Sequence, residues 1–79
     1  MSPTFLRYKK YRFYVNSREE TRIHIHVASP DAEAKIWLEP NVELAVNYGL
    51  RQTELNEVIE IAKEKRDEFK DLWRTHFGV

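Results

Sequence analysis

Two short runs of strictly alternating side chains constrain the fold of this chain more than any other feature. In residues 22–27 and again in residues 34–39, apolar side chains alternate with polar or aromatic ones. Successive side chains of a strand point to opposite sides of a sheet, so this period of two predicts two strands with one buried face each. The side chains expected to face the core are Ile23, Ile25, Val27, Ala34, Ile36 and Leu38. The side chains expected to face outward are Arg22, His24, His26, Lys35 and Trp37.

The segment between these two runs predicts a tight connection. Residues 29–32 contain a proline, which presets φ, and an aspartate, which is common in turns. A four-residue loop at this place makes the two strands an antiparallel hairpin and fixes which residues lie opposite each other. The expected cross-strand pairs are His26 with Lys35, His24 with Trp37, and Arg22 with Glu39.

Two further strands are expected near the amino terminus. Residues Thr4 to Tyr8 and Tyr11 to Asn16 are rich in aromatic and apolar side chains and surround a turn at Lys9 and Lys10. Pairing Tyr8 with Tyr11 puts the apolar side chains of both strands on the core side. The side chains then expected on the outward side are Arg7, Arg12 and Tyr14. A polar connection over residues 16–20 leads to the next strand.

The carboxyl-terminal half predicts helices. Asn41 and Gly49 are suitable first and last residues for a short helix over Val42–Tyr48. From about Gln52 to about Phe77, apolar residues recur every three or four positions, which predicts one long helix. Its expected core residues are Leu55, Val58, Ile59, Ala62, Phe69, Leu72, Trp73 and Phe77. The predicted fold is therefore one α+β domain over residues 1–79, a four-stranded antiparallel sheet with both helices on one face (β-β-β-β-α-α).

Composition narrows the classes of function. The 79 residues contain no cysteine, and 13 basic residues balance 13 acidic ones. The balance is uneven: residues 1–28 hold six basic and two acidic side chains, whereas residues 29–50 hold one and four. No apolar stretch is long enough to span a membrane, and the amino terminus has no signal pattern. We expect a cytoplasmic protein without a membrane association and without a cofactor.

His24 and His26 lie two residues apart on one predicted strand, so their imidazoles project from the same face about 7 Å apart. That spacing suits a transition metal, but the predicted register offers no suitable third ligand, and we expect no metal site. As a general acid and base, with Arg22 and Lys35 to hold a phosphate, the two histidines would suffice to cleave RNA. They are the candidate catalytic residues. The simpler interpretation is that both are polar residues on a solvated face.

The outward face combines cations with aromatic rings. Proteins that bind single-stranded nucleic acid use this mixture, because rings stack on bases and cations meet phosphates. The same mixture forms the energetic centre of many protein–protein interfaces. A net charge of zero gives RNA no general attraction, which favours a protein partner. The candidate binding residues are Arg7, Arg12, Tyr14, Arg22, Lys35 and Trp37.

The strand His24-x-His26-Val27, the strand Ala34-Lys35-Ile36-Trp37-Leu38 and the segment Tyr48-Gly49-Leu50 before a long helix together resemble a known family. It is the small prokaryotic domain-of-unknown-function family 4160, and the resemblance covers essentially the whole chain. Members are often encoded beside a second small protein, and such pairs have been proposed as toxin–antitoxin systems.

The resemblance therefore implies a small protein encoded nearby as partner. We expect an uncharacterised binding module, one member of a toxin–antitoxin-like pair, that acts through the face carrying His24, His26 and Trp37. The alternative is a small metal-independent ribonuclease or a single-stranded RNA-binding protein that uses the two histidines with Arg22 and Lys35. A homodimer is also compatible with the sequence.

Overall fold

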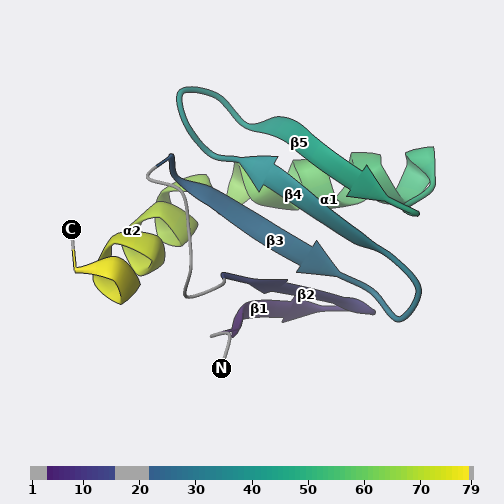
Figure 1. The fold of residues 1–79 in the computed structure, drawn as a ribbon, viewed down its shortest axis with the longest axis horizontal. Coiled ribbons are helices and arrows are strands. Elements are labelled where there is room, and N and C mark those ends of the chain that lie inside the picture. Colours follow the sequence, from purple (N-terminus) through teal and green to yellow (C-terminus); the bar gives the residue numbers. More distant parts are fainter. Residues whose placement is uncertain (1–3, 16–21, 79) are drawn as a thin grey trace.

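The computed structural model describes residues 4–15 and 22–78. It has the predicted α+β architecture, with an antiparallel sheet followed by two helices (Figure 1). The sheet has five strands rather than the predicted four, in the order β1-β2-β3-β4-β5. The strands are β1 (Thr4–Tyr8), β2 (Tyr11–Tyr14), β3 (His24–Ala28), β4 (Glu33–Trp37) and β5 (Glu43–Tyr48), and the helices are α1 (Gln52–Glu64) and α2 (Arg66–Phe77).

The register of the first four strands agrees with the alternation in the sequence. Tyr8 lies opposite Tyr11, and the amide of Ser29 donates to the carbonyl of Ala32 at 2.9 Å to close the predicted turn. The pairing of β3 with β4 matches His26 with Lys35 and His24 with Trp37. The third predicted pair, Arg22 with Glu39, lies beyond the end of the β3–β4 ladder. There the Nε of Arg22 donates to the carbonyl of Glu39 at 2.8 Å. The predicted connection over residues 16–20, with Asn16 as the end of the second strand, lies outside the described residues.

The predicted short helix over Val42–Tyr48 is wrong, because this segment forms the edge strand β5. Its residues pair with β4 from Tyr48 opposite Glu33 to Glu43 opposite Trp37. The register shifts by one residue at Ala45, since Val46 lies opposite Lys35 and Leu44 opposite Ile36. A bulge of this kind bends an edge strand and strengthens its twist.

The predicted long helix is two helices that meet at Lys65. The backbone of Lys65 has φ −100° and ψ 9°, outside the helical range, although its amide still donates to the carbonyl of Ile61 at 2.9 Å. The carbonyl of Lys65 likewise accepts from the amide of Phe69 at 2.8 Å, so both backbone groups of the residue at the bend are paired. Arg66 holds the new direction, because its guanidinium donates to the carbonyls of Leu38 and Pro40 at the end of β4. Neither helix is long and apolar enough to cross a membrane, among the residues described.

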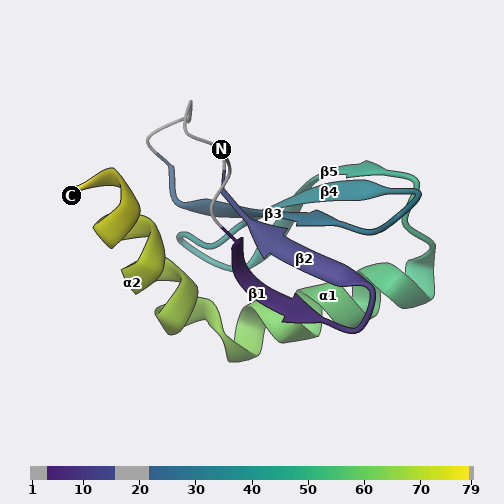
Figure 2. The same ribbon diagram turned by 90° about the horizontal axis from the view of Figure 1, so that it is seen from below.

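The two helices occupy different places on the sheet. In Figure 2, α1 lies beneath the sheet, whereas α2 rises past the end of the sheet near the start of β3. Of the predicted long helix, α1 and the first half of α2 with Phe69 cover the predicted face, and the second half of α2 does not. Because α2 climbs past the end of the sheet, its side chains reach residues on both faces there.

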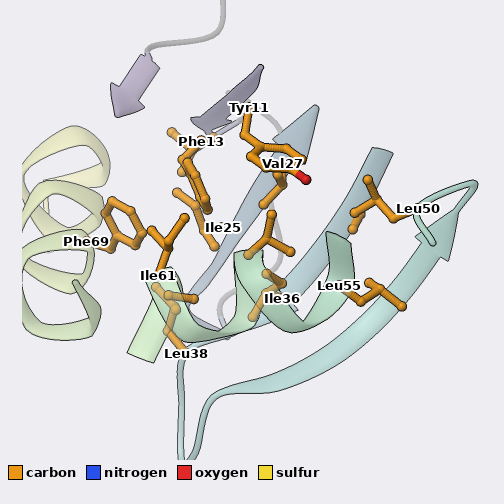
Figure 3. Close-up of a cluster of buried hydrophobic side chains, with 14 of the residues drawn as sticks. Tyr11, Phe13, Ile25, Val27, Ile36, Leu38, Leu50, Leu55, Ile61 and Phe69 are labelled. Carbon is orange, nitrogen blue, oxygen red and sulfur yellow. The ribbon is translucent and has the colours of Figure 1, made fainter. Parts of the chain in front are cut away.

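The core lies between the sheet and α1 and continues to the first half of α2 (Figure 3). Every side chain predicted to face inward from residues 22–27 and 34–39 is buried there. From the helices, Leu55, Val58, Ile61, Ala62, Phe69 and Trp73 are buried, and Ile59 and Phe77 are partly buried. Leu72 was predicted in the core but is 38% exposed, because the buried side of α2 follows Phe69 and Trp73, four residues apart, and Leu72 lies to one side of that line.

Gly49 joins β5 to α1, and we expect its replacement by alanine to destabilise the fold. Its φ is +99°, which L-residues rarely adopt, and an added Cβ would lie 3.2 Å from the Cβ of Ala32. The Gly49→Ala substitution should lower the free energy of unfolding by roughly 1–2 kcal/mol, the usual cost of a positive φ for an L-residue. Urea denaturation measures this difference. Gly78→Ala is the control, since Gly78 also has positive φ but nothing within 4 Å and lies at the end of α2. Equal losses for both variants would contradict the role of the Ala32 contact.

Candidate functional site

The outer face of the sheet, opposite α1, carries the predicted binding residues in cross-strand rows. Tyr14, His26 and Lys35 lie opposite one another on β2, β3 and β4. Side chains paired in this way have Cβ atoms about 4.5–5.5 Å apart and interact directly. Neighbouring outer-face pairs are Arg7 with Arg12 and His24 with Trp37. The fold therefore brings the predicted residues together on one surface.

The cations of the outer face lie against its rings. The guanidinium of Arg22 is 4.2 Å, and the ammonium of Lys35 is 4.5 Å, from the ring centroid of Trp37. The guanidinium of Arg12 is 4.6 Å from the centroid of Tyr14. Contacts of this kind contribute roughly 0.5–1 kcal/mol each at exposed sites. Because the cations cover it, Trp37 is half-buried rather than open to solvent as the alternation suggested.

His24 is on the outer face but not at the surface, which corrects the prediction that it points into solvent. It is 0% exposed, since α2 rises past the end of β3 and brings Trp73 to 6.4 Å from the imidazole. The other rings around it are those of His26, at 5.1 Å, and Trp37, at 5.7 Å. The Nδ1 of His24 is 2.7 Å from the carbonyl of Arg22, so Nδ1 carries the proton donated to that oxygen. The two predicted catalytic rings thus lie in contact with each other, but His24 is sealed from solvent.

His26 is partly exposed and borders a shallow depression on the outer face. Its ring stacks on Tyr14 with a centroid separation of 5.3 Å. The depression has a volume of about 250 Å³ and reaches as far as β5. Its side-chain lining is Tyr14, His26, Glu33, Lys35, Val46 and Tyr48.

Tyr48 and Val46 were missed as outer-face residues, because their segment was predicted to be a helix. Tyr48 is 70% exposed and lies opposite Glu33 on the edge of the sheet. Apolar and polar residues alternate over residues 42–48, which is a signal for a strand, but the bulge at Ala45 puts Leu44 and Val46 on opposite faces and cannot be read from that pattern. Tyr48 and Val46 extend the outer face to the β5 edge.

The family model for the domain of unknown function DUF4160 matches residues 10–74. The chain belongs to this family. No curated protein and no solved structure matches the chain. The matched segment of the DUF4160 chain runs from the turn before β2 into the last part of α2, so it contains the outer-face residues of β2, β3, β4 and β5 and leaves β1 outside.

The DUF4160 chain has no metal-binding cluster in the part that the structure describes. Within residues 4–15 and 22–78, no three His, Cys, Asp or Glu side chains are grouped so that they could hold an ion. The described outer face offers cations and rings rather than ligands.

On the other side of the DUF4160 chain, two ion pairs join the β1–β2 turn to the first turns of α1. Lys9 pairs with Glu57 at 2.6 Å, and Lys10 pairs with Glu54. Glu54 also accepts a hydrogen bond from the amide of Arg51 at 2.8 Å, which caps the start of α1. The side chain of Arg51 has no hydrogen-bond acceptor and cannot bind the backbone amide of Glu54. Only half of a capping box is therefore formed.

These contacts predict that acid destabilises the fold partly through Glu54. The amide of Arg51, and then Lys10, hold the pKa of Glu54 below its ordinary value of 4.5. A carboxyl with a lowered pKa stabilises the fold above its unfolded-state pKa, and that stabilisation is lost as pH falls through its folded-state pKa. Denaturation curves below about pH 4.5 should therefore show a smaller pH dependence for Glu54→Gln than for the wild type.

The Lys10→Gln variant provides the matched comparison for this pH dependence. It removes the weaker of the two causes and keeps the Arg51 hydrogen bond, so its pH dependence should lie between those of the wild type and Glu54→Gln. The same acid slope in all three proteins would show that Glu54 does not contribute.

Proposed function

We propose that this chain is a binding module, one member of a toxin–antitoxin-like pair of small proteins, and that an acidic partner protein docks on the outer face. The observation that carries the proposal is the placement of cations over the rings of Trp37 and Tyr14. The side chains of such a face are already held in position, so less conformational entropy is lost when a partner binds.

The same placement favours a protein over single-stranded RNA. Bases bind such platforms by stacking on open ring faces. Here Arg22 and Lys35 already lie against Trp37, and Arg12 and the His26 ring lie against Tyr14. A base would have to displace these groups, whereas a carboxylate of a partner could meet the cations where they lie.

The charges of the face fit an acidic partner. Its described cations outnumber its described carboxylates by four to two. Complementary charge speeds the encounter and suppresses wrong partners. The cations are Arg7, Arg12, Arg22 and Lys35, and the carboxylates are those of Glu33 and Glu43.

Binding also accounts for His24 better than catalysis does. A general acid or base must reach its substrate within hydrogen-bonding distance. The 0% exposure of His24 leaves an RNA phosphate no access to that ring. The buried ring of His24 packs against Trp37 and Trp73 and so stabilises the outer face.

The proposal is tested by producing this protein together with the small protein encoded beside it, followed by size-exclusion chromatography and nucleic-acid staining. We expect a stoichiometric protein complex free of RNA. The Lys35→Glu variant should weaken the complex, and Lys63→Glu on the exposed side of α1 serves as the charge-matched control. A complex unaffected by Lys35→Glu, or bound RNA without a protein partner, would overturn the proposal.

A further inference from the structure

A second surface feature, outside the depression beside His26, is an open pocket of about 440 Å³ at the end of the sheet. It is formed by the segment before β3, the connection from β4 to β5 and the first residue of α2. Its lining residues are Arg22, Glu39, Pro40 and Arg66. The two guanidinium groups come from segments 44 positions apart in the sequence, and only the fold brings them together.

Both guanidinium groups are held in place by backbone carbonyls. Arg66 donates from Nε to the carbonyl of Leu38 at 2.9 Å and from Nη2 to that of Pro40 at 3.1 Å. Arg22 donates from Nε to the carbonyl of Glu39 at 2.8 Å. These bonds use only part of the five N–H donors of each arginine. The remaining N–H donors belong to side chains that line the pocket.

The carboxylate in the lining does not neutralise these arginines. The Oε1 of Glu39 instead lies 3.0 Å from the Nζ of Lys70 and 3.5 Å from Nη2 of Arg74, both on α2. Neither Arg22 nor Arg66 has a carboxylate partner among residues 4–15 and 22–78. The lining itself therefore holds two guanidinium groups and one carboxylate, and that carboxylate is already paired with Lys70 and Arg74.

We propose that this pocket binds a phosphomonoester dianion. Two oriented guanidinium groups match the oxygens of a phosphate with paired N–H donors, the geometry in which arginine is superior to lysine. A phosphomonoester near neutral pH brings two negative charges to the two guanidinium groups, whereas a carboxylate brings only one. The ring of Pro40 gives the organic group of the ester an apolar wall.

This proposal goes beyond the binding of a partner protein and is tested on the chain alone. Inorganic phosphate, phenyl phosphate and benzoate are titrated at pH 7.5 and constant ionic strength, with the Nε–Hε signals of the arginines followed by NMR. We expect saturable shifts of the Arg22 and Arg66 signals, with phenyl phosphate bound at least tenfold more tightly than benzoate. Equal affinities for the two compounds would overturn the proposal.

Variants separate the pocket from general charge attraction. Arg22→Gln and Arg66→Lys should each weaken phenyl phosphate binding at least tenfold, and Arg51→Gln, at an exposed arginine just before α1, should leave it unchanged within twofold. Because Arg66 also holds the bend between the helices, its variant can fail to fold. Arg22→Gln then decides alone, since Arg22 is exposed and contacts the carbonyl of Glu39 and the ring of Trp37 rather than holding the bend. Unaltered binding by Arg22→Gln would overturn the proposal.

A titration with a nucleoside 5′-monophosphate and with O-phosphoserine then identifies the organic group, since both carry the same dianion. Tighter binding of one than of phenyl phosphate assigns the source of the phosphate. Equal binding of all three phosphomonoesters shows that the phosphate alone is recognised. Either result supports the pocket. If none of the three phosphomonoesters binds, the proposal is wrong.

Discussion

Replacement of Phe69 by alanine is expected to lower the free energy of unfolding by about 3–5 kcal/mol, the usual cost of removing a buried phenyl ring. Phe69 is fully buried and belongs to α2, but its ring packs against the first strands of the chain. Its centroid is 5.5 Å from that of Phe13 in a stacked arrangement and 6.4 Å from that of Phe5. The loss should therefore loosen α2 from the sheet as well as open a cavity.

Denaturation by urea, followed by circular dichroism, measures the effect on stability. A domain of this size has a total stability of roughly 4–12 kcal/mol, so the variant can lie close to its unfolding transition. Phe69→Leu gives a smaller and measurable loss in that case. The matched control is Leu72→Ala on the same helix, because Leu72 is exposed and should cost well under half as much as Phe69. Similar losses at both positions would contradict the burial of Phe69 and the exposure of Leu72 on α2.

This pair of variants also distinguishes the structure from what periodicity alone predicts. Apolar residues at three- and four-residue steps assign Phe69 and Leu72 equally to the core, on the assumption of one straight helix. The stripe is interrupted between Ala62 and Phe69, where Lys65 and Arg66 stand at positions that a continuous stripe would fill. That gap is visible in the sequence, but the carbonyls that bind Arg66 come from the end of β4 and cannot be read from local spacing.

The strands show where sequence reasoning succeeds and where it fails. Alternation predicted β3 and β4 and their register, because a one-residue shift would turn every buried side chain to the solvent. The same logic missed β5, where Asn41 and Gly49 are good helix ends. In the structure Gly49 is needed for its positive φ beside Ala32, not for ending a helix. Turn chemistry alone could not distinguish these two uses.

The sequence predicted which residues lie on the outer face but not how deeply each of them is buried. The outward positions of Tyr14, His26, Lys35 and Trp37 follow from the period of two and are confirmed by the register. The burial of His24 does not follow from it, because the covering ring of Trp73 comes from a helix almost fifty residues further along the chain. Exposure on an open sheet face depends on what crosses the ends of the sheet.

The second large effect is expected at Trp37, whose replacement by alanine should weaken the complex with the partner protein by about 2 kcal/mol or more. A tryptophan near the centre of an interface is the commonest kind of residue with such an effect. Here the loss has two parts, because the ring would contact the partner and also holds Arg22 and Lys35 in place. An effect of 2 kcal/mol corresponds to an increase of about 30-fold in Kd, which isothermal titration calorimetry measures directly.

Two controls separate loss of contact from loss of fold. Tyr8→Ala removes a partly exposed ring, 41% accessible, from a residue that pairs with buried Tyr11 on the helix side of the sheet, and it should leave the Kd unchanged. Trp37→Phe keeps a ring for the two cations and should recover part of the affinity. Because Trp37 also contacts His24, the thermal midpoint of each variant is measured beside its Kd. A Trp37→Ala protein that is folded and binds its partner with unchanged Kd would exclude the part of the outer face around Trp37 as the docking surface.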